Sequence, residues 1–184
     1  YSPRVIIWDT ASLRAKKVLN LGADSCGVSC VTFSPDGKLL AVASQDANHT
    51  VSIYTWSDMA LKCSVGTGTG KILDFAFSMD QKKIVAVGDR TFSVMTIDGK
   101  NLACQRGQFG KASGGRQVLT SVTFVGGDFC IGSAKGKLFR LEGGRKLTVE
   151  TQIFEKAKVT VLTPLQPPSD KEATGYPAVL VGGE

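Results

Sequence analysis

The chain has 184 residues, of which 42% are hydrophobic and only 21% charged, and its 21 glycines suit a turn-rich all-β protein with a substantial core. No stretch approaches the roughly 18 apolar residues that a membrane-spanning helix needs, so no such helix is predicted. The net charge is +6, from 22 basic and 16 acidic residues.

The first predicted element is a short strand at residues 4–9, and a complete strand unit follows it. Strands are predicted at 28–33, 39–44 and 50–54. The first two are joined by Ser34-Pro35-Asp36-Gly37, a turn in which proline presets φ, aspartate bonds to its local backbone and glycine tolerates positive φ. Leu39–Ala43 is a continuous apolar run, which predicts a strand that is covered on both faces.

The same unit recurs along the chain. A second copy has strands at 72–77, 84–88 and 92–97, and a third has strands at 121–124, 129–133 and 137–141. A fourth begins at 159–162 and reaches 178–183, with a proline-rich insertion from Gln166 to Pro177 where the earlier copies have a tight turn. Residues 4–9 correspond to the closing strand of an earlier copy, so both ends of the chain fall inside the repeat.

The spacing of the copies predicts the fold class. Each closing strand ends in a pair that resembles Trp-Asp, at intervals of 48, 41 and 44 residues. These pairs are Trp8-Asp9, Trp56-Ser57, Ile97-Asp98 and Leu141-Glu142. A period of about 40 to 45 residues is typical of WD-repeat propeller blades, which bury their faces against neighbouring blades. We therefore expect residues 1–184 to be part of a larger WD-repeat β-propeller, with missing blades outside the chain.

In repeat terms, the prediction assigns about four blades, the terminal ones incomplete. The boundaries fall near 4–9 (partial), 10–57, 58–98, 99–142 and 143–184 (partial). The five cysteines are an odd number, and Cys30 and Cys130 lie in predicted core strands. They are expected as small buried side chains in a reducing compartment, not as disulfide partners.

Basic residues are concentrated between Lys100 and Lys146, a stretch that contains nine basic and only two acidic residues. Such a region attracts an acidic partner surface, although solvated positions on outer strands and loops are the alternative interpretation. Aromatic residues do not alternate with the basic ones, which argues against a nucleic-acid platform. The candidate protein-contact residues are Lys111, Arg116, Lys135, Lys137 and Arg145.

The sequence predicts no catalytic, cofactor-binding or metal site. Gly66–Lys71 lacks the spacing of a phosphate-binding loop, since the required glycine and hydroxyl positions hold Val65 and Ile72. Cys26 and Cys30 are four residues apart, but His49 is the one histidine and no second cysteine pair follows. His49 lies in a predicted turn, where a solvated side chain is expected. We therefore expect a protein that is not an enzyme.

Several segments resemble the echinoderm microtubule-associated protein-like family of WD-repeat proteins. They are Arg4–Asp9, Gly27–Ser34 and the loop Gly107-Gln108-Phe109-Gly110-Lys111 before Leu119–Phe124. The similarity runs over roughly residues 4 to 165. It implies tandem atypical propellers, association with tubulin or microtubules, and no catalytic activity. Ile97 departs from the family pattern, which tends to have tryptophan at that position.

Two functional hypotheses follow. The first is a scaffold in the cytoplasm and cytoskeleton, with the axoneme of a cilium or flagellum as one location, that binds tubulin or other cytoskeletal proteins through the basic stretch. The second is a general adaptor whose propeller binds a peptide or regulatory protein without direct tubulin contact. Neither involves nucleic acid, a membrane or a cofactor.

Overall fold

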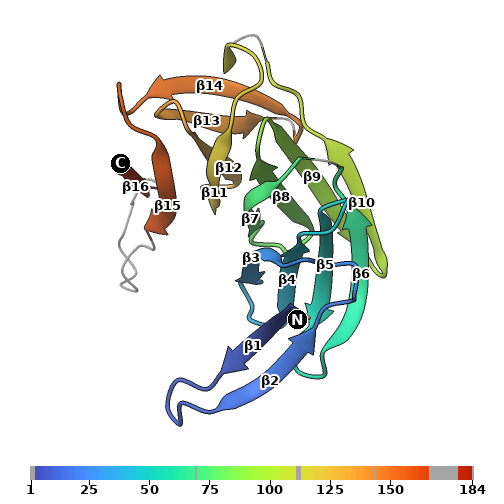
Figure 1. Ribbon diagram of the computed structural model, residues 1–184. Helices are drawn as coiled ribbons and strands as arrows, with labels where there is room; N and C mark the ends of the chain where they lie inside the picture. The colour runs from blue at the N-terminus through green and yellow to red at the C-terminus, as the bar shows by residue number, and fades with distance from the viewer. Residues whose placement is uncertain (1–2, 69, 111–112, 143, 166–177, 184) are drawn as a thin grey trace.

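The computed structural model describes residues 3–68, 70–110, 113–142, 144–165 and 178–183. The regular elements in these residues are β-strands that form five separate antiparallel sheets. Figure 1 shows the sheets side by side in an arc around a common centre. The prediction of an all-β fold built from radial propeller blades is confirmed. The predicted insertion at Gln166–Pro177 lies outside the described residues.

Three sheets are complete four-stranded blades. Blade 1 contains β3 (Val28–Phe33), β4 (Leu39–Ser44), β5 (Thr50–Thr55) and β6 (Ala60–Gly66). Blade 2 contains β7 (Ile72–Phe77), β8 (Lys83–Gly88), β9 (Thr91–Asp98) and β10 (Asn101–Arg106). Blade 3 contains β11 (Leu119–Val125), β12 (Asp128–Ser133), β13 (Lys137–Glu142) and β14 (Lys146–Gln152). In each blade the strands follow chain order, and in Figure 1 the first strand lies innermost and the fourth outermost.

A two-stranded sheet flanks the blades at each end of the arc. β1 (Arg4–Trp8) pairs with β2 (Ala15–Asn20), and β15 (Val159–Leu165) pairs with β16 (Ala178–Gly183). The predicted strand at 4–9 therefore corresponds to β1. The connection from β2 to β3 leads into blade 1. A sequence repeat that starts at β2 therefore contains the outer strand of the β1–β2 sheet and the strands β3, β4 and β5 of blade 1.

The apolar cores lie between neighbouring sheets, not within one sheet. All six residues of β4 are buried. Leu39, Ala41 and Ala43 pack with blade 2, whereas Leu40 and Val42 pack with the β1–β2 sheet. In the same way, Ile84 and Ala86 of β8 face blade 1, and Val85 and Val87 face blade 3. The continuous apolar runs in the sequence follow from this arrangement, because both faces of an inner strand are covered.

Blades 1 and 2 use the same hairpin turn. In blade 1 the Ser34 hydroxyl donates to Asp36 Oδ1 at 2.6 Å and accepts the Leu39 N–H at 2.9 Å. The bond from Ser34, followed by one from the Lys38 N–H, lowers the pKa of Asp36 to about 2. In blade 2, Ser78 and Asp80 repeat these contacts at 2.5 Å, and the Lys83 N–H donates to the Ser78 hydroxyl at 3.0 Å. The predicted turns are therefore confirmed in detail.

One carboxylate connects the innermost strands of the three blades. Asp74 of β7 accepts the backbone N–H of Val122 on β11 at 2.8 Å through Oδ2, and that of Phe75 at 2.8 Å through Oδ1. The thiol of Cys30 on β3 lies 3.8 Å from Oδ1. Burial is the main effect on Asp74 and raises its pKa, while the backbone donors oppose it. The thiol of Cys30 is also desolvated by burial, and this effect, followed by the negative charge of Asp74, raises its pKa to about 12.

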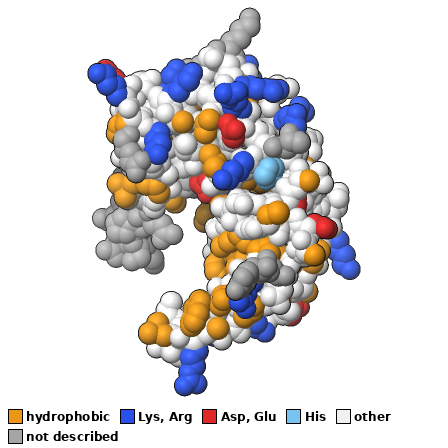
Figure 2. All heavy atoms as spheres, viewed as in Figure 1, with side chains coloured by type: hydrophobic (Ala, Val, Ile, Leu, Met, Phe, Trp, Pro, Cys, Tyr) orange, Lys and Arg blue, Asp and Glu red, His pale blue; other side chains and the backbone are white. Residues whose placement is uncertain are grey.

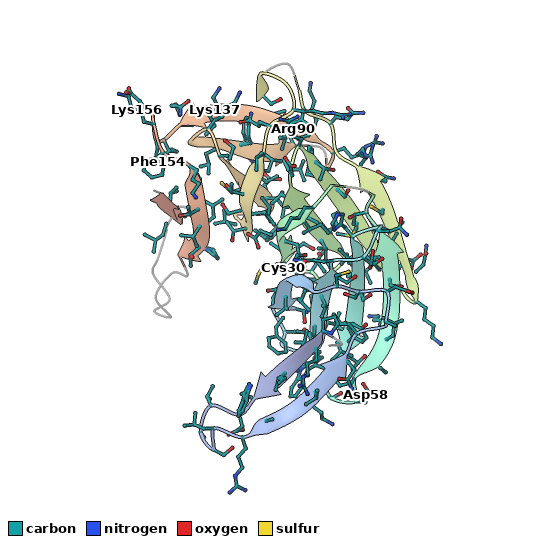
Figure 3. The ribbon with its side chains drawn as sticks, viewed as in Figure 1. Cys30, Asp58, Arg90, Lys137, Phe154 and Lys156 are labelled. Carbon is teal, nitrogen blue, oxygen red and sulfur yellow. The ribbon has the colours of Figure 1, made fainter. Side chains whose placement is uncertain are left out.

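The cysteines differ in burial from the prediction. Cys30 on β3 and Cys130 on β12 are half-buried, and Cys63 on β6 is the buried one. Figure 3 labels Cys30 at β3, which lies along the inner side of the arc. All five cysteines are free thiols.

Candidate interaction surface

The turn between β4 and β5 is built around Asp46. Its carboxylate accepts the Ser44 hydroxyl, the Asn48 N–H at 2.8 Å and the Thr50 N–H at 3.2 Å. Burial raises the pKa of Asp46, but the hydrogen bonds from Ser44, Thr50 and Asn48 outweigh it and lower the pKa overall. His49 in this turn has a positive φ of 46°, and its N–H donates to the Asp46 carbonyl at 3.1 Å. His49 is thus held in place by the turn and is half-buried, not fully solvated as expected.

The loop that carries the family resemblance joins blade 2 to blade 3. The Gly107 N–H donates to the Phe92 carbonyl at 2.9 Å, and a side chain at Gly107 would lie 1.8 Å from the Phe92 ring. The Phe109 ring packs edge-on against Phe92 with centroids 5.2 Å apart. Gln108 pairs with the start of β14, since its N–H donates to the Arg145 carbonyl at 2.8 Å and its carbonyl accepts the Leu147 N–H at 3.1 Å. Residues 107–110 are therefore a fixed wall between two blades.

A polar cavity of about 390 Å³ lies against this wall, and we call it the Arg90 cavity. Segments from all three blades meet there: the β4–β5 turn with His49, the β8–β9 turn with Asp89 and Arg90, and the connections that precede β7 and β11. Phe92 and Phe109 form its apolar part. Its basic lining residues are Lys71, Arg90, Arg106 and Arg116.

A second cavity, of about 600 Å³, lies at the β12–β13 turn of blade 3, and we call it the Lys135 cavity. Lys135, Lys137 and Lys156 line it together with Glu155. The Gln152 side-chain amide donates to the Lys135 carbonyl at 2.9 Å, which ties the end of β14 to the turn. Figure 2 shows Lys and Arg side chains over the upper blades on the same face as the histidine, and Figure 3 labels Arg90, Lys137 and Lys156 along that edge.

The structure separates the predicted contact residues. Arg116 lines the Arg90 cavity, and Lys135 and Lys137 line the Lys135 cavity. Arg145 precedes β14 at the β13–β14 turn, which is at the opposite end of the blade 3 strands from the β12–β13 turn. Lys111 lies outside the described residues. The predicted set is therefore not a single patch.

Sequence reasoning did not find Lys71, Arg90 and Arg106, which come from outside the strongest basic stretch or were not singled out within it. For Arg90, its place in the repeat could have indicated a shared surface. Arg90 occupies the tight turn between the second and third strands of blade 2, and Lys135 lies in the corresponding turn of blade 3. In an antiparallel blade these turns share one end of the strands, so cations in successive turns face the same side.

Two further observations limit the chemistry of the described residues. Within them, no group of three or more His, Cys, Asp or Glu side chains is placed to hold a metal ion. No helix in the described segments has the length and apolar character to cross a membrane.

Comparison with known proteins defines the class. Residues 15–55 match the family model described as "WD domain, G-beta repeat". The crystal structure of the Myceliophteria thermophila Cps50 (Swd1) β-propeller domain superposes with a TM-score of 0.71, covering 97% of this chain and 64% of that one at 12% identity. At that identity the likeness shows the fold alone. The chain is a WD-repeat β-propeller segment.

Curated relatives narrow the comparison. Echinoderm microtubule-associated protein-like 4 of Xenopus tropicalis is 29% identical over 160 residues, which is 85% of this chain and 17% of the relative. The human protein of the same name is 26% identical over 137 residues, or 73% of this chain and 14% of the relative. The resemblance to the echinoderm microtubule-associated protein-like family is therefore confirmed. The chain spans about a sixth of the length of the Xenopus relative and about a seventh of the human one. Fold and relatives together support a role as a scaffold in protein interactions.

Proposed function

We propose that the chain is a non-catalytic scaffold of the cytoskeleton that binds tubulin or another cytoskeletal protein. The observation that carries the proposal is the alignment of 85% of the chain with relatives whose name describes them as microtubule-associated. The cations that line the Arg90 and Lys135 cavities support it, because a positively charged face attracts an acidic protein surface. A location on cytoplasmic microtubules, including those of an axoneme, follows from the proposal.

The test is co-sedimentation of the purified chain with stabilised microtubules at increasing salt. A variant with Lys111, Arg116, Lys135 and Lys137 changed to glutamine should sediment less than the wild type. The difference should be largest at low salt, because exposed charges are screened over about 8 to 10 Å at ordinary ionic strength. Arg145→Gln is made separately, since Arg145 lies at the other end of the strands.

A matched control carries the same change in net charge elsewhere. Lys17, Lys62, Lys82 and Lys100 line neither of the two cavities. Their replacement by glutamine should leave sedimentation unchanged. Equal loss of sedimentation in both quadruple variants would contradict a specific contact. Unchanged sedimentation of the folded variant that lacks Lys111, Arg116, Lys135 and Lys137 would remove these residues from the proposal. Absence of nucleotide hydrolysis by the same preparation checks the non-catalytic assignment.

The alternative is a general adaptor that binds a peptide or regulatory protein, with any microtubule contact made by other parts of the polypeptide. One observation favours it: the chain corresponds to only 17% of its relative, so microtubule association named for the relative need not lie in this segment. The adaptor predicts that the chain stays in the supernatant with microtubules at every salt concentration.

A further inference from the structure

The Arg90 cavity concentrates positive charge that the described protein does not neutralise. Lys71, Arg90, Arg106 and Arg116 face one lining carboxylate, that of Asp89. Among the residues that the structure describes, no ion pair within 4.0 Å joins any of the four cations to a carboxylate. Like charges gathered at one concave site repel one another, and a bound anion would relieve that repulsion.

The walls of the cavity are fixed before any ligand arrives. The Asp89 N–H donates to the Lys71 carbonyl at 3.0 Å, which holds the β8–β9 turn against the connection that precedes β7. Arg90 has a positive φ of 55°, a conformation that non-glycine residues adopt mainly in tight turns, and the turn thereby fixes the backbone direction at this point of the wall. The backbone that carries these cations is therefore preorganised, and the cost of binding is confined to the ordering of their side chains.

His49 lines the same cavity beside these cations. An imidazole offers nitrogen donors, which suit a ligand that brings oxygen acceptors.

The charge and the donors select a compact dianion. A single carboxylate would balance one of the four positive charges, whereas a phosphate monoester carries about −1.5 to −2 at pH 7 and three acceptor oxygens. Three of the four cations are exposed arginines, and a guanidinium group binds phosphate through two parallel hydrogen bonds. We propose that the Arg90 cavity binds a phosphorylated serine or threonine side chain of a partner protein.

The second cavity argues for a polypeptide ligand over a free ion. The Lys135 cavity lies at the corresponding end of the next blade, with Lys135 and Lys156 in its lining. A peptide that places its phosphate in the Arg90 cavity can extend acidic side chains toward the neighbouring turn, whereas inorganic phosphate fills one site. This inference does not depend on tubulin binding and holds for either proposed function.

The test measures fluorescence anisotropy of labelled five-residue peptides, Gly-Gly-X-Gly-Gly, in which X is phosphoserine, glutamate or serine. The phosphopeptide should bind the purified chain at least about tenfold more tightly than the glutamate peptide, a difference of about 1.4 kcal/mol. The serine peptide should show no binding, and excess inorganic phosphate should displace the phosphopeptide.

The variants locate the site. Arg90→Gln with Arg106→Gln should weaken phosphopeptide binding at least about tenfold, and Arg90→Lys should weaken it less, because lysine keeps the charge but not the two-point contact. The matched control, Lys82→Gln with Lys100→Gln, removes equal charge from the β7–β8 and β9–β10 turns, at the opposite end of the same strands. Its binding should stay within about twofold of the wild type.

Two outcomes would contradict the proposed site. The first is equal affinity for the glutamate and phosphoserine peptides. The second is an equal loss of phosphopeptide affinity in the Arg90→Gln, Arg106→Gln double variant and in its control. If the double variant fails to fold by circular dichroism, the single variants Lys71→Gln and His49→Gln replace it and should each weaken binding. Co-sedimentation of the same double variant with microtubules keeps a failure of this site distinct from a failure of the proposed function.

Discussion

Replacement of Asp74 tests whether one carboxylate holds neighbouring blades together. Asp74→Ala removes the acceptor for the N–H of Val122 on β11 and that of Phe75 on β7, both at 2.8 Å. A buried backbone donor left without a partner costs about 1–3 kcal/mol. Because Val122 is buried and both lost bonds are charge-assisted, while desolvation of the carboxylate offsets part of their value, we expect a loss of about 2–3 kcal/mol in the free energy of unfolding.

The assay is urea denaturation followed by far-ultraviolet circular dichroism. Asp74→Asn keeps one side-chain oxygen as an acceptor but turns its amide group toward the other donor, so it should lose about 1 kcal/mol. The control is Asp98→Asn at an exposed position on β9, which should stay within about 0.5 kcal/mol of the wild type. A loss below that limit for Asp74→Ala would refute the reasoning.

The pH dependence supplies an independent check. Burial raises the pKa of Asp74 above its ordinary value of 3.8, so the native state binds a proton more tightly than the unfolded chain. The contribution of Asp74 to the free energy of unfolding therefore falls as the pH rises from about 3.8 through the raised native value. The stability advantage of the wild type over Asp74→Asn should shrink across that window. An advantage that grows with pH would contradict the direction of the shift.

Three further predictions concern single positions. Gly107→Ala should lower the free energy of unfolding by about 1–3 kcal/mol, because its new methyl group would meet the Phe92 ring. Gly22→Ala, with open space around it, should be nearly neutral, and equal effects of the two substitutions would argue against a tightly packed wall at Gly107. Gly37 and Gln81 occupy the same turn position in blades 1 and 2, with φ of 68° and 58°. Gln81→Gly should therefore stabilise the folded chain and Gly37→Gln should destabilise it, each by about 1 kcal/mol in thermal unfolding. Effects of the same sign would be inconsistent with the shared turn. Exposed Cys26 should react first with a thiol reagent at pH 8, and buried Cys63 should react only on unfolding. Half-buried Cys30, whose pKa is raised to about 12, should react much more slowly than Cys26, and rapid labelling of Cys30 would count against its contact with Asp74.

Much of the fold could be predicted because its determinants are local. Ser34-Pro35-Asp36-Gly37 specifies its turn through contacts among neighbouring residues, and Ser78 and Asp80 repeat them without the proline and glycine. The apolar run of β4 predicts burial on both faces, and the structure places its alternating residues in two different cores. Periodicity then supplies the architecture, because units with two buried faces stack against their neighbours.

The candidate site could not be predicted in the same way, because it is assembled from residues far apart in the sequence. His49 and Arg116 line one cavity although 67 positions separate them. No local pattern states that the β4–β5 turn, the β8–β9 turn and the connection after β10 converge. The bond from Val122 to Asp74 spans 48 residues and depends on how adjacent blades pack. A count of basic residues from Lys100 to Lys146 also combines Lys135 and Arg145, which lie at opposite ends of their strands.

The pairing of Gln108 with the edge of β14 has a mechanical consequence. The linker between β10 and β11 is bonded to the outer strand of blade 3 through the Gln108–Arg145 and Leu147–Gln108 hydrogen bonds, in addition to its continuation into β11. Because the linker is attached to both the inner and the outer strand of blade 3, we expect blades 2 and 3 to unfold in one step when the chain is pulled. Separation of the two blades then requires these two hydrogen bonds to break together with the contacts between the inner strands.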